Sequence, residues 1–325
     1  MNETISRRTA LTTTAAAATL IATAGPARAQ AAFKLGVVAF QMSSETHARV
    51  ANTVEAEAKK KGWQVTLLNS RGSQPEHVAQ IDNLVQAGVN GMILCMARVN
   101  EAEAQLAAAK AKGIPVITVM ANTTPNALFD ISVDDFAAGS QITNYLLARM
   151  NYEGGLLAQR YEGNVSTRAR GKVFDAVLSE NTGVKVLGQH VMARPQGWQE
   201  DVRQGMETLT LRHQGQFKGI WAAFDGQAFI IDDILQSRGA KKGDVLVTGV
   251  DGGQETFKRI RDPKSTLSAT VAIPFEPMGV RAVDLMDRIV VQKQPKEKHV
   301  AGARVLVPTV LVDETNVPGD GAWPW

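Results

Sequence analysis

The chain has 325 residues, which is enough for two domains of ordinary size. Hydrophobic residues make up 44% of it and charged residues 21%, a balance that excludes a disordered or membrane-embedded chain. The formal net charge is only +3 and no basic patch of the kind that nucleic acid requires stands out, so we expect no nucleic-acid partner.

The first 31 residues have the pattern of a secretory signal peptide. A basic pair, Arg7-Arg8, precedes an apolar run, and Ala27-Arg28-Ala29 forms a small-residue cleavage site. The residues around the pair resemble a twin-arginine signal. The apolar run is too short to span a bilayer. We therefore predict that residues 1–31 are removed and that the mature protein is exported across a membrane.

Strand and helix patterns alternate along the chain from Phe33 onward. Short runs of β-branched and apolar residues are followed by segments with helical periodicity. Such alternation predicts a mostly parallel sheet with helices on both faces. In the first series we expect strands at 34–40, 63–69, 91–96 and 115–120, helices at 44–61, 75–87 and 100–112, and a short strand from 131 that leads into a helix at 135–150.

A second series of similar size follows, and a coda of strand, helix and strand ends the chain. The coda predicts that the chain crosses back to the first domain and then again to the second, which makes a cleft between two lobes that can hinge. We expect strands at 156–161, 184–191, 219–224 and 245–251, helices at 167–181, 198–212, 226–237 and 254–260, and then a strand at 267–273, a helix at 276–291 and one extended segment at 303–312.

The stretch VLVTGVDGGQETFKRI organises the second series. An apolar run ends on Asp251, and Gly252-Gly253 allow a tight turn into the next helix. An acid at the carboxyl end of a buried parallel strand lies where open α/β sheets bind ligands. The alternative is that Asp251 only caps the helix that follows it.

The residue patterns of most enzymes are absent from the sequence. The five histidines show no metal-ligand spacing, and no phosphate-binding glycine loop or nucleophile elbow follows a strand. The single cysteine, Cys95, lies in the apolar run GMILCM, where we expect it to pack in the core. We therefore predict no catalytic residues, no metal and no cofactor.

Six motifs follow one another along the chain in an informative order: KKKGWQV, AKGIPVITV, SVDDFAAG, STRARG, GVDG and LSATVAIPFEPMG. With this order and spacing the chain resembles the periplasmic sugar-binding proteins of the ribose and galactose type, which are soluble receptors of ABC importers. The resemblance implies the type I periplasmic binding protein fold: two doubly wound, mostly parallel α/β lobes joined by a multi-strand hinge. The N-terminal lobe would comprise residues 32–134 and 273–303, and the C-terminal lobe residues 135–272 and 304–325.

In the N-terminal lobe the resemblance places the ligand-binding loop at Phe40 to His47. The family has Asn-Pro-Phe-Phe where this chain has Ser44, Glu45, Thr46 and His47, so Phe40 becomes the candidate stacking ring. After PVITV the family carries an Asp-Arg pair, whereas this chain has Met120-Ala121 and then Asn122. The departure argues against a standard pentose or hexose. The candidate residues of this lobe are Phe40, Ser44, Thr46, His47 and Asn122.

In the C-terminal lobe the match to the family is better. Arg168 stands at the ligand-binding arginine and Trp198 at the stacking aromatic, although a surface arginine and a packing tryptophan are the alternatives. In the N-terminal lobe, Arg98 follows the third strand and points toward the cleft, where we favour a solvated loop arginine over a contact with the carboxylate or phosphate of a ligand. Asp225 is expected to cap its helix. The candidates of this lobe and its hinge are Arg168, Trp198, Phe224, Asp251 and Ile273, the last at the position of the family's hinge glutamine.

The resemblance implies a monomeric receptor in the periplasm that binds a sugar, a polyol or a small modified sugar in the cleft between its lobes. The ligand would bridge the lobes and stabilise their closure, and the closed form would meet the membrane permease of an ABC importer. One alternative is a ligand-sensing accessory protein for a membrane kinase or chemoreceptor. A second is a two-lobed α/β enzyme.

Overall fold

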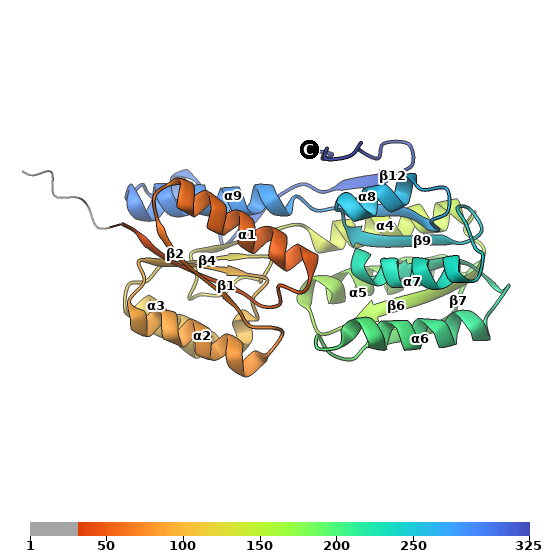
Figure 1. Cartoon of the computed structure of the whole chain (residues 1–325), viewed down its shortest axis with the longest axis horizontal. Coiled ribbons are helices and arrows are strands. Elements are labelled where there is room, and N and C mark those ends of the chain that lie inside the picture. The colour runs from red at the N-terminus through yellow and green to blue at the C-terminus, as the bar shows by residue number, and fades with distance from the viewer. Residues whose placement is uncertain (1–31) are drawn as a thin grey trace, which may run out of the picture. The chain divides into compact units, whose positions relative to one another are not determined.

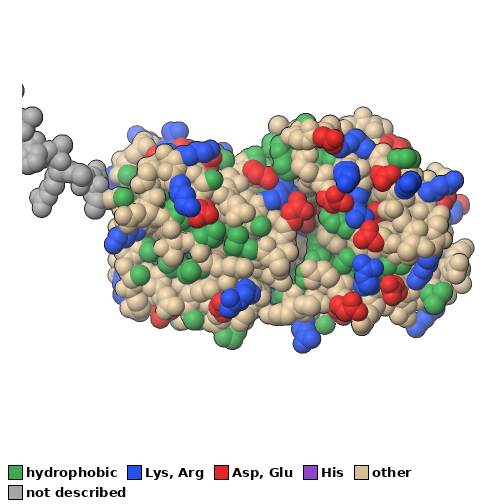
Figure 2. Space-filling view, in the orientation of Figure 1, with side chains coloured by type: hydrophobic (Ala, Val, Ile, Leu, Met, Phe, Trp, Pro, Cys, Tyr) green, Lys and Arg blue, Asp and Glu red, His purple; other side chains and the backbone are tan. Residues whose placement is uncertain are grey.

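The computed structural model describes residues 32–325, which form one compact unit. The predicted signal peptide lies outside the described residues. Within residues 32–325, no helix combines the length and the apolar composition that crossing a membrane would take. On the face drawn in Figure 2, acidic and basic side chains are interspersed over both lobes.

The N-terminal lobe is built on a parallel sheet of six strands (Figure 1). In spatial order the strands are β11 (Arg304–Leu306), β5 (Phe129–Ser132), β4 (Val116–Val119), β3 (Gly91–Cys95), β1 (Lys34–Ala39) and β2 (Gln64–Asn69). Helices follow β1, β2, β3 and β5, as the alternating pattern predicts, whereas a loop without a helix joins β4 to β5.

The C-terminal lobe repeats this strand order in a second six-stranded sheet. Its strands are parallel, except that β12 runs antiparallel to β10. The expected fold of two mostly parallel α/β lobes is confirmed. In spatial order the strands are β12 (Val310–Asp313), β10 (Leu267–Ala272), β9 (Leu246–Asp251), β8 (Phe217–Ala222), β6 (Gly154–Tyr161) and β7 (Val184–Met192).

Helices cover both faces of each sheet because successive residues of a strand point to opposite faces. In β1, for example, Val37 packs in one core cluster and Val38 in another. The first sheet lies between α1 (Glu45–Lys60) with α9 (Phe275–Met286) and α2 (Gln74–Ala87) with α3 (Glu103–Ala111). The second lies between α4 (Asp135–Arg149) with α5 (Val165–Glu180) and α6 (Trp198–Arg212), α7 (Asp225–Ser237) and α8 (Gln254–Arg261).

The end of the chain differs from the sequence prediction. The extended segment expected at 303–312 is two short strands that belong to different sheets. Pro308 lies between them, and proline cannot donate a ladder hydrogen bond, which ends β11 before the chain crosses to the second lobe. Residues 304–306 therefore pair with β5 in the N-terminal lobe, and assigning them to the C-terminal lobe was wrong. The helix expected at 276–291 also ends early, at Met286, and continues as one π-helical turn.

The buried carboxylate of Asp225 shapes the turn after β9. The cap position of α7 is Phe224, so the expectation that Asp225 caps its own helix was wrong. Instead Asp225 accepts hydrogen bonds from the backbone N–H of Gly252 and from the hydroxyls of Thr256 and Thr270, each at 2.8 Å. A side chain at Gly252 would lie 2.4 Å from the Cβ of Ala272, so this turn requires glycine.

We predict that Asp225→Ala lowers the free energy of unfolding by about 3 kcal/mol or more, because it leaves three buried donors without an acceptor. Asp233, on the same helix, is a matched control: its half-exposed carboxylate pairs with Arg259, and its alanine variant should lose less than about 1 kcal/mol. Urea unfolding of the two variants measures the difference. Equal small losses would show that Asp225 does not hold the turn.

Candidate functional site

A cavity lies between the two lobes, where the carboxyl ends of both sheets face each other. This edge is where open α/β sheets place their ligands. The cavity has a volume of about 100 Å³, which suits a small molecule and not a polymer. Seven of the sequence candidates line the cavity: Phe40, Ser44, Thr46, His47, Trp198, Phe224 and Asp251.

Three candidates lie elsewhere. The Oδ1 of Asn122 accepts a hydrogen bond from Arg304 at 2.8 Å in an outer groove on the hinge side, which adjoins the cavity at Arg98 and Met120. Ile273 is fully buried in the core, and its side chain does not reach the cavity. Arg168 donates to the carbonyl oxygen of Glu162 at 2.7 Å and lines the same outer groove.

The arginine of α5 that lines the cavity is Arg170, two residues further along the helix. Two residues turn a helix by about 200°, so Arg168 and Arg170 point to different sides. The guanidinium of Arg170 is held from behind by Asp135, whose Oδ1 lies 3.0 Å from Nε, and by the carbonyl oxygen of Ala223 at 3.0 Å. Its side chain is 3% exposed. The position of its charge is therefore fixed before any ligand arrives.

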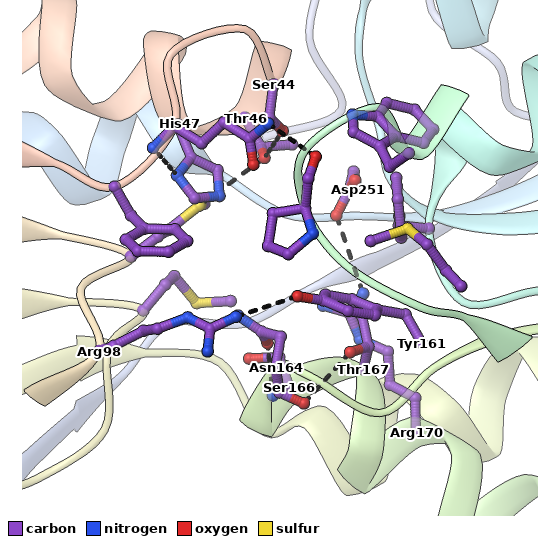
Figure 3. A pocket seen from close by; sticks show the side chains of 18 of the residues that line it. Ser44, Thr46, His47, Arg98, Tyr161, Asn164, Ser166, Thr167, Arg170 and Asp251 are labelled. Atoms are coloured by element: carbon purple, nitrogen blue, oxygen red, sulfur yellow. Dashed lines mark hydrogen bonds and ion pairs between the residues drawn. The ribbon is translucent and has the colours of Figure 1, made fainter. Parts of the chain in front are cut away.

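Asp251 faces this guanidinium across the floor of the cavity (Figure 3). Its Oδ1 lies 3.8 Å from Nη1 of Arg170. Burial raises the pKa of Asp251 well above its usual value, and the nearby Arg170 lowers it in part. The backbone of Asp251 has φ of 148°, a strained conformation of the kind that concentrates at functional sites. Asp251 does not cap α8, because the cap residue there is Gly253.

Polar groups at the start of α5 complete this wall. Asn164 caps the helix by accepting the backbone N–H of Ser166 at 2.8 Å, and the side chains of Asn164, Ser166 and Thr167 line the cavity. Trp198 and Phe224 stand beside them in an edge-to-face pair with ring centres 5.3 Å apart. Charge, hydroxyl and aromatic groups thus meet on the C-terminal lobe.

Arg98 crosses the cavity from the N-terminal lobe. Its Nη2 donates to the Tyr161 hydroxyl at 3.1 Å, and its guanidinium lies 4.8 Å from the centre of the Phe40 ring (Figure 3). Arg98 points toward the cleft, as expected, but it bonds to Tyr161 of the other lobe, in contrast to the favoured interpretation of a solvated loop arginine. The Phe40 ring beneath the guanidinium and the ion pair with Glu101 hold the Arg98 side chain in place.

His47 is a neutral donor at the roof of the cavity. Burial, and the charge of nearby His77, lower its pKa from 6.5 to about 4. Its Nδ1 accepts the backbone N–H of Gln41 at 3.2 Å. A neutral imidazole that accepts at one nitrogen carries its proton on the other, so Nε2–H is the donor that remains for a ligand.

Sequence reasoning missed several residues of the cavity. Helix periodicity could have found Arg170, because Thr167, Arg170, Gly171 and Phe174 form the buried face of α5. The motif STRARG contains Ser166 and Thr167, and Met120 stands at the position of the family's Asp-Arg pair, but none of the three was named as a candidate. Met96 and Met120 follow strands with unusual backbone turns, at φ of 51° and 53°. The missed lining residues are Gln41, Met96, Met120, Tyr161, Asn164, Ser166, Thr167, Arg170, Met192, Pro195 and Phe275.

We predict that His47 and His77 together lower the unfolding free energy as pH drops from 6.5 to about 4, against an opposite contribution from Asp225 and Asp251, whose pKa values are raised by burial. The pKa of His77 is also lowered to about 4 by burial, so the unfolded chain takes up protons at His47 and His77 in this window while the folded protein does not. The double variant His47→Asn with His77→Asn lacks the histidine contribution, so relative to the wild type it should gain stability as the pH falls through this window. The partly exposed His213→Asn should keep the slope of the wild type, and identical slopes in all three proteins would contradict the assignment.

The chain is similar to known proteins over most of its length. The model of the periplasmic binding protein domain matches residues 35–294. The ribose import binding protein RbsB of Bacillus subtilis (strain 168) is 24% identical over 259 residues, which cover 79% of this chain and 81% of that protein.

Two solved structures show the same fold. An ABC transporter solute binding protein from Agrobacterium vitis with bound allitol has a TM-score of 0.77 at 19% identity, covering 88% of this chain and 97% of that one. Another, from Mycobacterium smegmatis with bound glycerol, has a TM-score of 0.77 at 22% identity, covering 88% and 96%. The chain belongs to the family of the periplasmic binding protein domain.

Proposed function

We propose that this protein is a periplasmic receptor of an ABC importer and that it binds a small sugar or polyol between its lobes. The observation that supports this most directly is the Asp251 carboxylate beside the Arg170 guanidinium, in a cavity that also holds the rings of Trp198 and Phe224. A carboxylate accepts hydrogen bonds from neighbouring hydroxyls, a guanidinium donates to their oxygens, and an indole face packs on C–H groups.

The relatives support a hydroxyl-bearing ligand. One is described as importing ribose, and the structures hold allitol and glycerol. Each arginine of the cavity has an acidic partner, Asp135 and Asp251 for Arg170 and Glu101 for Arg98, which favours a neutral ligand over an anion or a cation. Export of the mature chain, a monomeric state and docking on a membrane permease belong to the same proposal. A sensor for a membrane kinase or chemoreceptor would use the same cavity and remains the alternative.

Closure of the lobes would be the working motion. The chain passes between the lobes near residues 133–134, 273–274 and 307–309, which form a three-segment hinge. On the opposite rim the lobes touch directly: Gln41 donates to the carbonyl oxygen of Pro195 at 3.0 Å, and Gln196 donates to that of Gly72. A ligand that contacts both lobes stabilises this closed form, because it can contact both at once only when the lobes are closed.

Arg49 acts as a latch in this closed form. It pairs with Glu276 of its own lobe at 2.7 and 2.9 Å, and its Nη1 donates to the carbonyl oxygen of Gly252 in the other lobe. The ring of Trp323, near the end of the chain, lies 4.8 Å from the guanidinium and covers it. Arg49 therefore binds the turn that follows Asp251 and ties it to the N-terminal lobe.

A thermal-shift screen of the protein without residues 1–31 against sugars and polyols tests the proposal, since a ligand of the folded state raises the melting temperature. For the best binder, calorimetry should show at least tenfold weaker affinity in Asp251→Asn, Trp198→Ala and Arg170→Lys. Arg168→Lys is the matched control and should bind as the wild type does. The proposal fails if no sugar or polyol stabilises the protein, or if the three variants keep full affinity.

A second prediction concerns the latch. Arg49→Gln should weaken the affinity for the same ligand about ten- to hundredfold, because a hydrogen bond from a charged group contributes about 1.5–3 kcal/mol to the closed form. The loss should appear mainly as faster dissociation in stopped-flow fluorescence. Arg71→Gln, which removes an exposed arginine paired with Glu76, serves as the control. An unchanged dissociation rate in Arg49→Gln would rule out the latch.

A further inference from the structure

The two walls of the cavity differ in the hydrogen bonds that they leave for a ligand. We propose that the ligand has one hydroxyl-bearing end and one apolar end, such as the methyl group of a terminally deoxygenated sugar. Its hydroxyls lie on the C-terminal lobe, and its apolar end lies against Phe40, Met96 and Met120. This inference rests on the proposed function and specifies the class and orientation of the ligand.

The C-terminal wall has open hydrogen-bonding capacity. Among residues 32–325 no side chain donates a hydrogen bond to Asp251, whose one charged partner is Arg170 at 3.8 Å. Asn164 uses its Oδ1 to cap α5, so its amide NH₂ is left for a ligand. The Ser166 hydroxyl lies next to it on the same lining. The Asp251 carboxylate, the Asn164 amide and the Ser166 hydroxyl can therefore all bond one end of the ligand.

The polar groups of the N-terminal wall are mostly bonded within the protein. The Ser44 and Thr46 hydroxyls bond each other at 3.2 Å, and Thr46 also lies within 3.7 Å of the Met96 sulfur. The Gln41 amide is bonded to Pro195 across the rim. Arg98 is engaged by Glu101 and Tyr161 and lies over the Phe40 ring. Among residues 32–325, the donors on this wall without a hydrogen-bond partner are His47 Nε2–H and the N–H groups of Arg98 other than the two that bond Glu101 and Tyr161.

Between these groups the wall is apolar. Met96 and Met120 follow β3 and β4, and their left-handed backbone turns the chain at the two strand ends nearest the cavity. A thioether is a weak acceptor and donates nothing. A ligand hydroxyl placed here would lose its water and gain no comparable partner, whereas a methyl group would be buried against sulfur and ring carbons. The methionines and the Phe40 ring of the N-terminal wall therefore favour an apolar end of the ligand over a hydroxyl-bearing one.

Matched pairs of sugars test this inference by calorimetry on the protein without residues 1–31. Each pair differs by one terminal hydroxyl: L-galactose with 6-deoxy-L-galactose, L-mannose with 6-deoxy-L-mannose, and D-ribose with 5-deoxy-D-ribose. The deoxy member of the pair that binds best should bind at least tenfold more tightly. If every pair that binds prefers the hydroxylated member or shows no preference, the inference is wrong and the proposed function stands. If no pair, sugar or polyol binds at all, the proposed function itself fails.

A variant locates the apolar contact. Met120→Asn puts a hydrogen-bonding amide on the N-terminal wall and should reduce the preference for the deoxy member at least fivefold, while circular dichroism reports whether the variant is folded. Leu211→Asn changes an exposed residue of α6 away from the cavity and should keep the wild-type preference. Met96→Asn provides a second test from the neighbouring strand end. An unchanged preference in folded Met120→Asn and Met96→Asn would overturn the orientation proposed here.

Discussion

The site depends on one buried pair of opposite charges, Asp251 and Arg170. Removing two charges from water costs more free energy than their attraction returns unless further bonds support them. Here Asp135 and the carbonyl oxygen of Ala223 hold the arginine, and Asp225 holds the turn behind Asp251. Within the described part of the chain, the Asp251 carboxylate has only the distant ion pair with Arg170. A structure that fixes a buried acid so firmly and leaves its oxygens open is suited to accept hydroxyl groups.

The two lobes show how one topology can produce unlike binding walls. Both sheets have the same strand order, and both present the carboxyl ends of their strands to the cavity. The second sheet places a charged residue there, Asp251 at the end of β9, whereas β4, at the same place in the first sheet, is followed by Met120 and its neighbour β3 by Met96. The fold therefore fixes where a ligand can lie, and the residues just after each strand determine its chemistry.

Much of the architecture could be predicted from sequence because hydrophobic periodicity reports burial directly. The alternation of strand and helix gave the two parallel sheets, and the apolar run before Asp251 placed that acid at a strand end. The segment at 303–312 was harder, because two strands of three and four residues around Pro308 carry too little pattern to show that they belong to different sheets.

The site was predictable only in part, because side-chain direction depends on details that a family motif does not contain. The motif pointed to Arg168, but the rotation of α5 turns Arg170 inward and leaves Arg168 at the outer groove. The contact between Arg98 and Tyr161 joins residues 63 positions apart, so no local pattern could reveal it. Met96 and Met120 are ordinary core residues in sequence and become lining residues only through their backbone turns.

The most direct test of the account is a crystal structure of the protein with its tightest-binding sugar or polyol. The account predicts closed lobes, with two ligand hydroxyl oxygens about 3 Å from the Asp251 carboxylate and the Arg170 guanidinium and the least polar end of the ligand against Met96 and Met120. A ligand bound outside this cavity, or one whose hydroxyls face the methionines while Asp251 contacts only water, would contradict it.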